Sequence, residues 1–231
     1  MPIQEENGFL VTRDLGITPA LAIETGKIDK CIEHINRMHF RGVFGSPSFG
    51  FKQDNLNFLD RIPQMIQLWF WDINLKNIDA IYSLEELRYC GINPKRPSID
   101  FSRLPKLKTL ISDWNRKDIG LASSNIAEFY LWHYNPNGKT FDGVEIPLNV
   151  SFLELNWVNP PSLNGMHQLP FLKELGIHRS RNLESLDDLL HIAPCLKKLI
   201  ITTCNRVKKF SGIENHPSLE FAIINGRRIK G

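Results

Sequence analysis

The chain has 231 residues, 42% of them hydrophobic and 23% charged, a composition typical of ordinary globular proteins. No apolar run approaches the roughly 18 residues that cross a bilayer, which excludes a transmembrane protein. The net charge of +3 is too small to predict nucleic-acid binding, and the basic excess after Leu172 is interpreted as a solvated terminal surface.

The N-terminus and the cysteines indicate a cytoplasmic protein. The opening residues, MPIQEENGF, lack the basic and apolar segments of a secretory signal. Cys31, Cys90, Cys195 and Cys204 are scattered without a CxxC pair, and are therefore expected to be reduced thiols.

The first segment, residues 1–34, shows no repeat and is predicted to cap the array that follows. Within it KIDKCIEHI favours an amphipathic helix, since Ile28, Ile32 and Ile35 share one side. Such a cap shields the apolar end of a repeat protein. Further on, residues 45–58 are rich in Gly, Ser and Phe and are predicted to be an inserted loop.

From residue 35 to residue 231 one pattern recurs, with apolar residues at its first, fourth and sixth positions; examples are MIQLWFWDI and LKELGIHRS. Clear copies begin at Met65, Leu84, Leu107, Ile126, Val150, Leu172, Leu196 and Leu219. A weaker copy, INRMHFRGV, begins at Ile35. The clear copies start 19 to 24 residues apart, so about nine irregular repeats are predicted over residues 35–231.

The L-x-x-L-x-L core and this period resemble those of leucine-rich repeat proteins. The resemblance implies an α/β fold: a curved solenoid with a parallel β-sheet on its concave face and helices, turns and loops on its convex face. Side chains at the fourth and sixth positions would enter the core, and those at the fifth and seventh would point outward. The family's ninth position is often Asn or Cys, which only Asn115 and Cys204 match here.

All five tryptophans fall on the predicted outward side. Trp69 occupies a fifth position, Trp71 and Trp132 occupy seventh positions, and Trp114 and Trp157 occupy eighth positions at strand ends. Because the apolar fourth and sixth positions define the core, these rings are expected to be substantially exposed and to mark a binding surface.

Charged and polar side chains accompany the aromatic ones on this face, which is the make-up of protein-interface hot spots. The predicted binding residues are Trp69, Trp71, Asp72, Arg88, Asp113, Trp114, Tyr130, Trp132, His133, Glu154, Asn156, Trp157, His178 and Arg179. The partner class that this surface predicts is a protein.

No catalytic or metal-binding motif is present. The seven histidines show no HxH or HExxH spacing, and GxSxG, P-loop and GxGxxG motifs are absent. Cys90 is predicted to be an outward but passive thiol, because no strong base is adjacent. Asp72, Asp113, His133 and His178 could meet across strands as an acid–base group, although rigid sheet faces more often carry contact residues. The sequence thus predicts no enzyme, no metal and no cofactor.

These features favour a non-catalytic protein-binding module that covers its partner. Some stand-alone bacterial leucine-rich repeat proteins neutralise a toxin or effector, so the resemblance implies a toxin-neutralising, immunity-type protein as the most concrete form. Alternatives are an intracellular scaffold or regulator of another enzyme, and a carbohydrate-binding protein whose tryptophans stack on sugars. Single-stranded nucleic acid is disfavoured because the aromatic region is not basic. No membrane partner is predicted, and the oligomeric state is left open.

Overall fold

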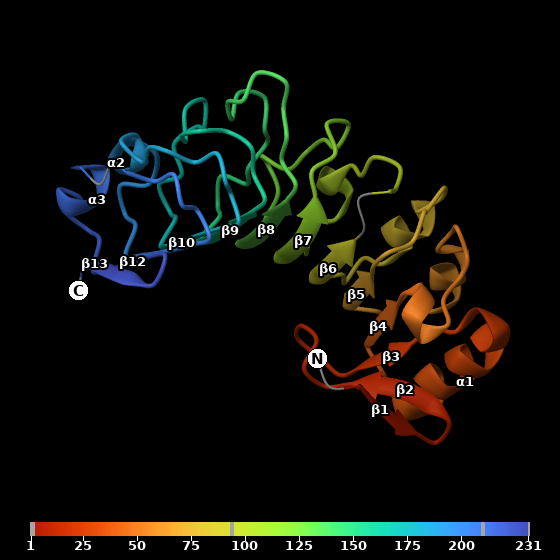
Figure 1. Cartoon of the computed structure of the whole chain (residues 1–231). Coiled ribbons are helices and arrows are strands. Elements are labelled where there is room, and N and C mark those ends of the chain that lie inside the picture. The colour runs from red at the N-terminus through yellow and green to blue at the C-terminus, as the bar shows by residue number, and fades with distance from the viewer. Residues whose placement is uncertain (1–2, 93–94, 209–210, 231) are drawn as a thin grey trace. The chain divides into compact units, whose positions relative to one another are not determined.

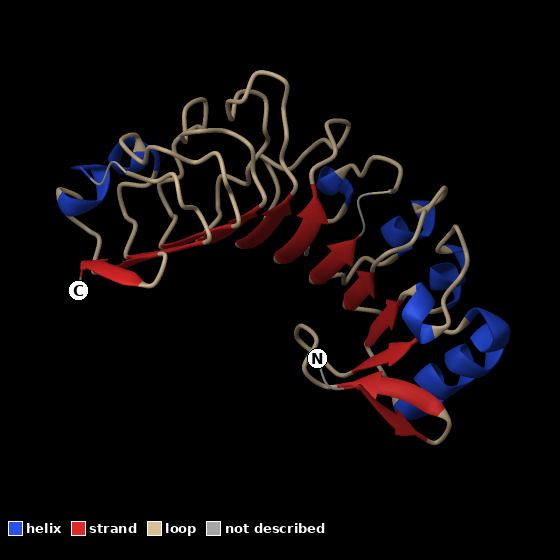
Figure 2. Ribbon diagram, in the orientation of Figure 1, coloured by secondary structure: helices blue, strands red, loops and turns tan. Residues whose placement is uncertain are grey.

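The computed structural model describes residues 3–92, 95–208 and 211–230 and divides into two compact units, which are treated separately below. Unit 1 holds residues 1–110 and 117–119, and unit 2 holds residues 111–116 and 120–231. In each unit the strands form one layer, and the connecting segments with their short helices form the other (Figure 1; Figure 2). Within the described ranges, no helix combines the length and the apolarity needed to cross a bilayer.

Unit 1 begins with antiparallel strands and continues with parallel ones. Its strands are β1 (Ile3–Glu6), β2 (Phe9–Thr12), β3 (Ala20–Ala22), β4 (Gly42–Gly45), β5 (Gln67–Phe70) and β6 (Tyr89–Ile92). β2 pairs antiparallel with β1 and β3, whereas β3 to β6 pair in parallel, each with the next. Its helices are α1 (Ile28–Met38) and the 3-10 helices η1 (Thr25–Lys27), η2 (Pro47–Phe49), η3 (Asn57–Arg61), η4 (Asp79–Ser83) and η5 (Phe101–Arg103).

Unit 2 opens with the last residues of β7 (Thr109–Asp113), a strand that the unit boundary divides. The following strands are β8 (Glu128–Trp132), β9 (Phe152–Asn156), β10 (Glu174–His178), β11 (Lys198–Thr202), β12 (Phe221–Ile224) and β13 (Arg227–Lys230). β8 to β12 pair in parallel, each with the next, and β13 pairs antiparallel with β12. Two short helices, α2 (Leu189–Ile192) and α3 (Ser211–Glu214), lie in the return segments.

The strand register of unit 2 confirms the repeat positions predicted there. The fourth-position residue Leu153 pairs with Phe129 and Leu175, and all three side chains are buried. The fifth-position residues Tyr130 and Glu154 pair with each other and stay partly exposed. The alternation therefore separates a core face from a second face, called the free face below. Parallel strands, one per repeat, and few helices fit a leucine-rich-repeat-like fold.

The first repeat begins later than predicted. The expected helix exists, but α1 continues through Ile35 to Met38 and ends at His39, which has φ 56°. β4 therefore pairs Phe44, and not His39, with Trp69. The copy INRMHFRGV was wrong because a helical side of α1 places apolar residues three apart, which is also the spacing that opens the strand motif.

The stretch 45–58 is an ordinary return segment and not an insertion. With the corrected register, Phe40 and Met65 open successive repeats 25 residues apart. Phe51 is fully buried in this segment, and its ring lies 5.1 Å from Phe70 and 5.9 Å from Phe58 in edge-on contacts. The phenylalanines that suggested a loop therefore fill the core beneath β5.

The copy predicted from Leu84 is also displaced, by three residues. Leu68 pairs with Cys90, which places Leu87 and not Leu84 at the first position of that repeat. Leu84 belongs to the preceding turn, where its carbonyl accepts a hydrogen bond from the backbone N–H of Leu87. In LEELRYCGI both Leu84 and Leu87 can open the repeat motif, and the pattern alone selected the wrong leucine. As a result Arg88 lies before β6 and not in it.

Candidate functional site

The two tryptophans of unit 1 are partly buried, so the expectation of substantially exposed rings was wrong. Trp71 lies beside Trp69, with ring centroids 6.2 Å apart. Trp69 packs on the free face against a small second core of Leu15, Ala20, Ala22 and Phe44. The strands and loop before α1 supply this cover, and no repeat pattern could have shown it.

Gln67 holds the covering loop in place. Its side chain is fully buried, and its Oε1 accepts hydrogen bonds from the backbone N–H groups of Ile17, at 2.6 Å, and Thr18, at 3.1 Å. Its Nε2 donates to the carbonyl oxygens of Leu15 and Thr18. The amide thus satisfies both of its polar atoms, as burial requires. Sequence reasoning missed this residue. The signal that could have found it is a polar side chain at a position of β5 that points away from the repeat core.

The remaining predicted residues of unit 1 do not assemble into a site. Arg88 is exposed, with its Nη2 3.7 Å from Oε2 of Glu86. Asp72 is exposed at the end of β5. Cys90, predicted to be a surface thiol, is fully buried, and desolvation raises its pKa from the usual 9.0 to about 12. A thiol held protonated in this way is a poor nucleophile at neutral pH.

In unit 2, three successive strands end in planar side chains that stack. His133 follows β8, Trp157 follows β9 and Arg179 follows β10. The rings of His133 and Trp157 have centroids 5.2 Å apart and planes 23° from parallel, and Arg179 Cζ lies 4.6 Å from the Trp157 ring centroid. Neighbouring strands are about 4.8 Å apart, so equivalent residues are spaced for stacking. We call these three residues the strand-end stack.

The backbone at the strand-end stack is left-handed. φ is 54° at His133, 52° at Trp157 and 54° at Arg179. Residues with a side chain rarely adopt this conformation, which costs about 1–3 kcal/mol at each position. The same turn occurs at Asp72 and Thr203, so it belongs to the repeat and is the means by which the strand ends. It also turns the side chain sideways along the sheet edge.

Asp113 anchors one end of the strand-end stack. Its carboxylate is 3% exposed and contacts Nδ1 of His133, whose side chain is 55% exposed. The second oxygen of Asp113, Oδ2, is buried and has no hydrogen-bond partner among the residues described. The buried carboxylate fixes the orientation of the imidazole, whose other nitrogen is directed away from the Asp113 contact.

The other aromatic residues of unit 2 that were predicted to bind divide between the free face and the flank. Trp132 is partly buried on the free face, its ring centroid 5.1 Å from that of Trp157. Tyr130 is also partly buried there, and desolvation raises its pKa. Trp114 instead packs edge-on against the fully buried Tyr134, at 5.0 Å, and so belongs to the flank.

A cleft of about 320 Å³ adjoins the strand-end stack. Besides the stack it is lined by Arg181 and by a row of asparagines. Asn159 Nδ2 donates to Asn135 Oδ1 at 2.6 Å, Asn182 donates to Asn159 Oδ1, and Arg206 Nη1 lies 3.4 Å from Asn182 Oδ1. These side-chain amides form a ladder of hydrogen bonds from one repeat to the next, which we call the amide ladder. Its residues lie one or two places after the ninth position of each repeat. Sequence reasoning missed it because only the ninth position was considered.

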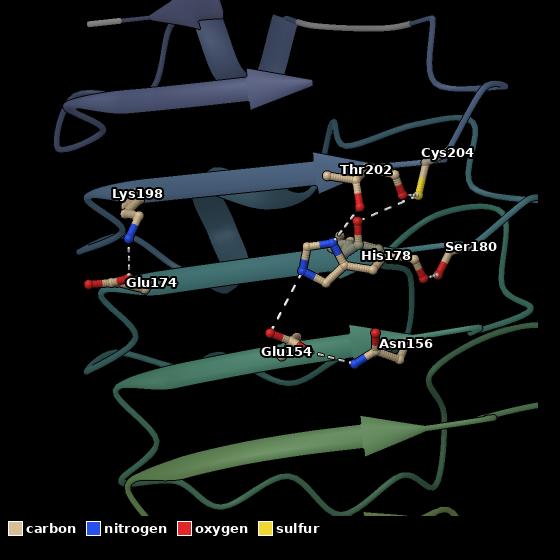
Figure 3. Close-up of polar contacts among 9 residues, drawn as sticks. Glu154, Asn156, Glu174, His178, Ser180, Lys198, Thr202 and Cys204 are labelled. Atoms are coloured by element: carbon tan, nitrogen blue, oxygen red, sulfur yellow. Dashed lines mark hydrogen bonds and ion pairs between the residues drawn. The ribbon is translucent and has the colours of Figure 1, made fainter. Parts of the chain in front are cut away.

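The ninth position itself is used as the family resemblance implied. Cys204 Sγ lies 3.4 Å from the carbonyl oxygen of Thr202 and 3.6 Å from that of Ile177. Ser180, which the Asn-or-Cys pattern excluded, accepts a hydrogen bond of 3.1 Å from the backbone N–H of Val158. Both side chains satisfy backbone groups at the strand ends, close to the free face (Figure 3).

A polar network crosses the free face of β9 to β11 (Figure 3). His178 Nδ1 is 2.7 Å from Thr202 Oγ1, and His178 Nε2 is 3.7 Å from Glu154 Oε2. Asn156 Nδ2 donates to Glu154 Oε1 at 2.8 Å. Gly176 leaves room for the imidazole, because a Cβ there would lie 2.8 Å from His178 Nε2. The network therefore holds the imidazole of His178 in the space that Gly176 leaves open.

This network does not assemble a catalytic group. Hydroxyl, imidazole and carboxylate follow one another as in a nucleophilic triad, but 3.7 Å is too long for a hydrogen bond between His178 and Glu154. Of the predicted acid–base residues in unit 2, Asp113 and His133 meet, whereas His178 contacts Thr202. Across the described part of the chain, no three or more His, Cys, Asp or Glu side chains are grouped to hold a metal ion. The arrangement suits polar contacts with a partner.

Comparison with solved structures shows a distant structural likeness. No family model matches the chain, and no curated protein matches it. Among solved structures it is similar to internalin C2 of Listeria monocytogenes, at 17% sequence identity and a TM-score of 0.46, over 89% of this chain and 80% of that one. A likeness at this level carries no conclusion about function. The repeat architecture rests on the sequence pattern and on the strand register.

Proposed function

We propose that the chain is a non-catalytic protein-binding module, a leucine-rich repeat solenoid whose free face binds and occludes a protein partner. The observation that most supports this is the free face of unit 2, where the rings of Tyr130 and Trp132 are neighbours of Glu154, Asn156 and His178. All of these except the buried Asn156 are partly exposed. Aromatic anchors beside polar groups are the make-up of interface hot spots.

The most concrete form of the proposal is a toxin-neutralising, immunity-type protein that acts in the cytoplasm. Neutralisation by occlusion needs a rigid surface and no chemistry of its own. The free face offers such a surface, because its side chains stand on hydrogen-bonded parallel strands and are held by the His178 network. A scaffold or regulator of another enzyme would use the same surface without blocking a catalytic centre.

The packing of the tryptophans disfavours carbohydrate binding. Sugars stack on an open aromatic face, whereas Trp157 is covered by His133 from one neighbouring strand and by Arg179 from the other. Trp69 is occupied by the second core of unit 1. These rings therefore present edges and not open faces, which suits insertion into a protein interface better than stacking on a sugar ring.

The test is a binding measurement with matched aromatic variants. A tagged chain would capture partners from a lysate of its native host, and the captured protein would be purified and titrated by isothermal calorimetry. Trp132→Ala and Tyr130→Ala should each weaken binding by about 2 kcal/mol or more if they are hot spots. Phe171→Ala is the control, because Phe171 is 58% exposed but precedes β10 and lies off the free face.

Two outcomes would contradict the proposal. One is a captured partner whose affinity is unchanged by Trp132→Ala and Tyr130→Ala while both variants remain folded. The other is a partner that the chain modifies chemically, since occlusion requires that the partner dissociate unaltered. Inhibition of a captured enzyme would support the toxin-neutralising form, and unaltered activity in the complex would favour the scaffold.

A further inference from the structure

The cleft beside the strand-end stack is basic. Its lining includes Arg179, Arg181 and His133 but no Asp or Glu. Within the ranges that the structure describes, neither guanidinium group has an ion-pair or hydrogen-bond partner, although the guanidinium of Arg206 nearby lies 3.7 Å from Glu184. Two guanidinium groups without a carboxylate, facing one cleft, are an arrangement that an anionic ligand would complete.

Arg179 is held ready for such a ligand. Its guanidinium carbon lies 4.6 Å from the ring centroid of Trp157, a cation–π contact that restrains the group without using its N–H groups. Those N–H groups remain available to a ligand, and a carboxylate can accept two of them side by side. The left-handed backbone at Trp157 and Arg179, which is costly for large side chains, is what sets this geometry.

The asparagines that line the cleft are neutral and are held by one another. The amide ladder engages Asn135, Asn159 and Asn182 with one another, and Arg206 is held at its end. His133 also lines the cleft, and its Nδ1 is held by the buried carboxylate of Asp113. The cleft is therefore bordered by rigid donors, and the charge that it offers is concentrated in two arginines.

We infer that this cleft binds the carboxylate side chains of an acidic segment on the protein partner. This inference rests on the proposed function and specifies the partner's chemistry. Planar forked donors match planar carboxylates, and two neighbouring arginines suit two closely spaced Asp or Glu side chains. A nucleic acid would instead require a track of cations that follows a phosphate backbone, and the cleft is bordered by amides where such a track would continue.

The experiment is a titration followed by nuclear magnetic resonance on the isotopically labelled full chain. The probe is an acetylated and amidated peptide, Gly-Asp-Glu-Asp-Gly, and its amide counterpart, Gly-Asn-Gln-Asn-Gly, is the neutral control. The acidic peptide should shift the Nε–H signals of Arg179 and Arg181 and the indole N–H signal of Trp157, in a saturable way. The amide peptide should leave these signals in place.

Arginine substitutions test whether the acidic peptide binds in the cleft. Arg179→Gln with Arg181→Gln should weaken binding of the acidic peptide by about tenfold or more, the loss expected when charge-assisted hydrogen bonds are removed. Arg116→Gln makes the same kind of change at an exposed arginine of unit 2 away from the cleft, and should leave binding unchanged. The amide spectrum of each variant verifies that it is folded.

Three results would overturn the inference. The first is an acidic peptide that shifts none of the cleft signals. The second is inorganic phosphate, or a short oligothymidylate, that shifts them at lower concentration than the peptide does. The third is a captured partner that loses affinity with Trp132→Ala but not with the double arginine variant, which would leave the proposed function standing and remove the cleft from it.

Discussion

The indole of Trp69 lies directly on Gly91, the residue with which it pairs across β5 and β6. A Cβ added at Gly91 would come within 2.1 Å of Trp69 Cδ1, much closer than atoms can approach. The large ring and the missing side chain are complementary, and together they let the second core of unit 1 form over the sheet.

This complementarity predicts a coupled pair of mutations. Gly91→Ala should lower the free energy of unfolding by about 1–3 kcal/mol through overpacking, and Trp69→Ala should lower it by about 2–4 kcal/mol through lost burial. The double variant should lose less than the sum, because removal of the ring makes room for the new methyl group. Denaturant unfolding of all four proteins measures the coupling, and strict additivity would show that the two residues do not touch.

Gln67→Ala should detach the covering loop. The substitution removes the acceptor for the Ile17 and Thr18 amides and leaves these partly buried backbone groups without their partner, at a cost of about 2 kcal/mol. Amide hydrogen exchange at Ile17 and Thr18 should accelerate well beyond that of the core strands. Gln64→Ala is the control, because Gln64 is exposed and its side-chain amide donates to Asn36 Oδ1 at 2.9 Å, outside the covering loop. Unchanged exchange in the Gln67 variant would mean that the loop is held by packing alone.

Cys90 predicts a loss of stability in alkali. Its thiol stays protonated in the folded chain up to a pKa of about 12, whereas the unfolded chain releases the proton near the ordinary value of 9.0. Above that lower value the unfolded state gains by ionising, so this contribution to stability is complete below about pH 9 and is lost as pH rises toward 12. Cys90→Ala should therefore have a flatter alkaline stability profile than wild type.

The control for the alkaline profile is Cys195→Ala, because Cys195 is exposed. Its denaturant midpoint should fall with pH as steeply as that of wild type. If the Cys90 and Cys195 variants gave the same profile, the thiol of Cys90 would have to be accessible to solvent in the folded chain.

Thr203→Gly should raise stability. Thr203 is exposed and has φ 58°, a conformation that is strained for a β-branched residue and free of strain for glycine. The expected gain is about 1 kcal/mol in thermal or denaturant unfolding, and Thr203→Ala should recover only part of it because a Cβ remains. A loss of stability on Thr203→Gly would indicate that the threonine side chain makes a compensating contact.

Sequence periodicity predicted the core of unit 2 well, because the residues that fill it are local to each repeat. Leu153 and Leu175 are buried at the fourth position, as the two-residue alternation of a strand requires. The pattern failed where two spacings competed. Leu84 and Leu87 both fit the motif, and the choice between them depended on whether Cys90 could be buried, which a hydropathy pattern does not decide.

The surroundings of the candidate site residues were predicted less well, for two physical reasons. The alternation of side chains along a strand places Trp69 on the outward face. It does not reveal that Leu15, far earlier in the chain, packs over it. The alternation of side chains also stops at strand ends, where the left-handed backbone turns Trp157 and Arg179 along the sheet edge. Contacts between distant segments, and side-chain directions set by unusual φ values, are beyond what spacing can predict.

The Gln67 contact has a consequence for how the chain is made. Ile17 and Thr18 precede Gln67 by about fifty residues, so when the N-terminal segment leaves the ribosome the amide that will hold it has not yet been synthesised. Until then the apolar side chains of Leu15 and Phe44 cannot pack against the indole of Trp69. This segment, although translated before β5, should thus be among the last of unit 1 to fold, and its apolar side chains stay exposed on the nascent chain until translation reaches β5.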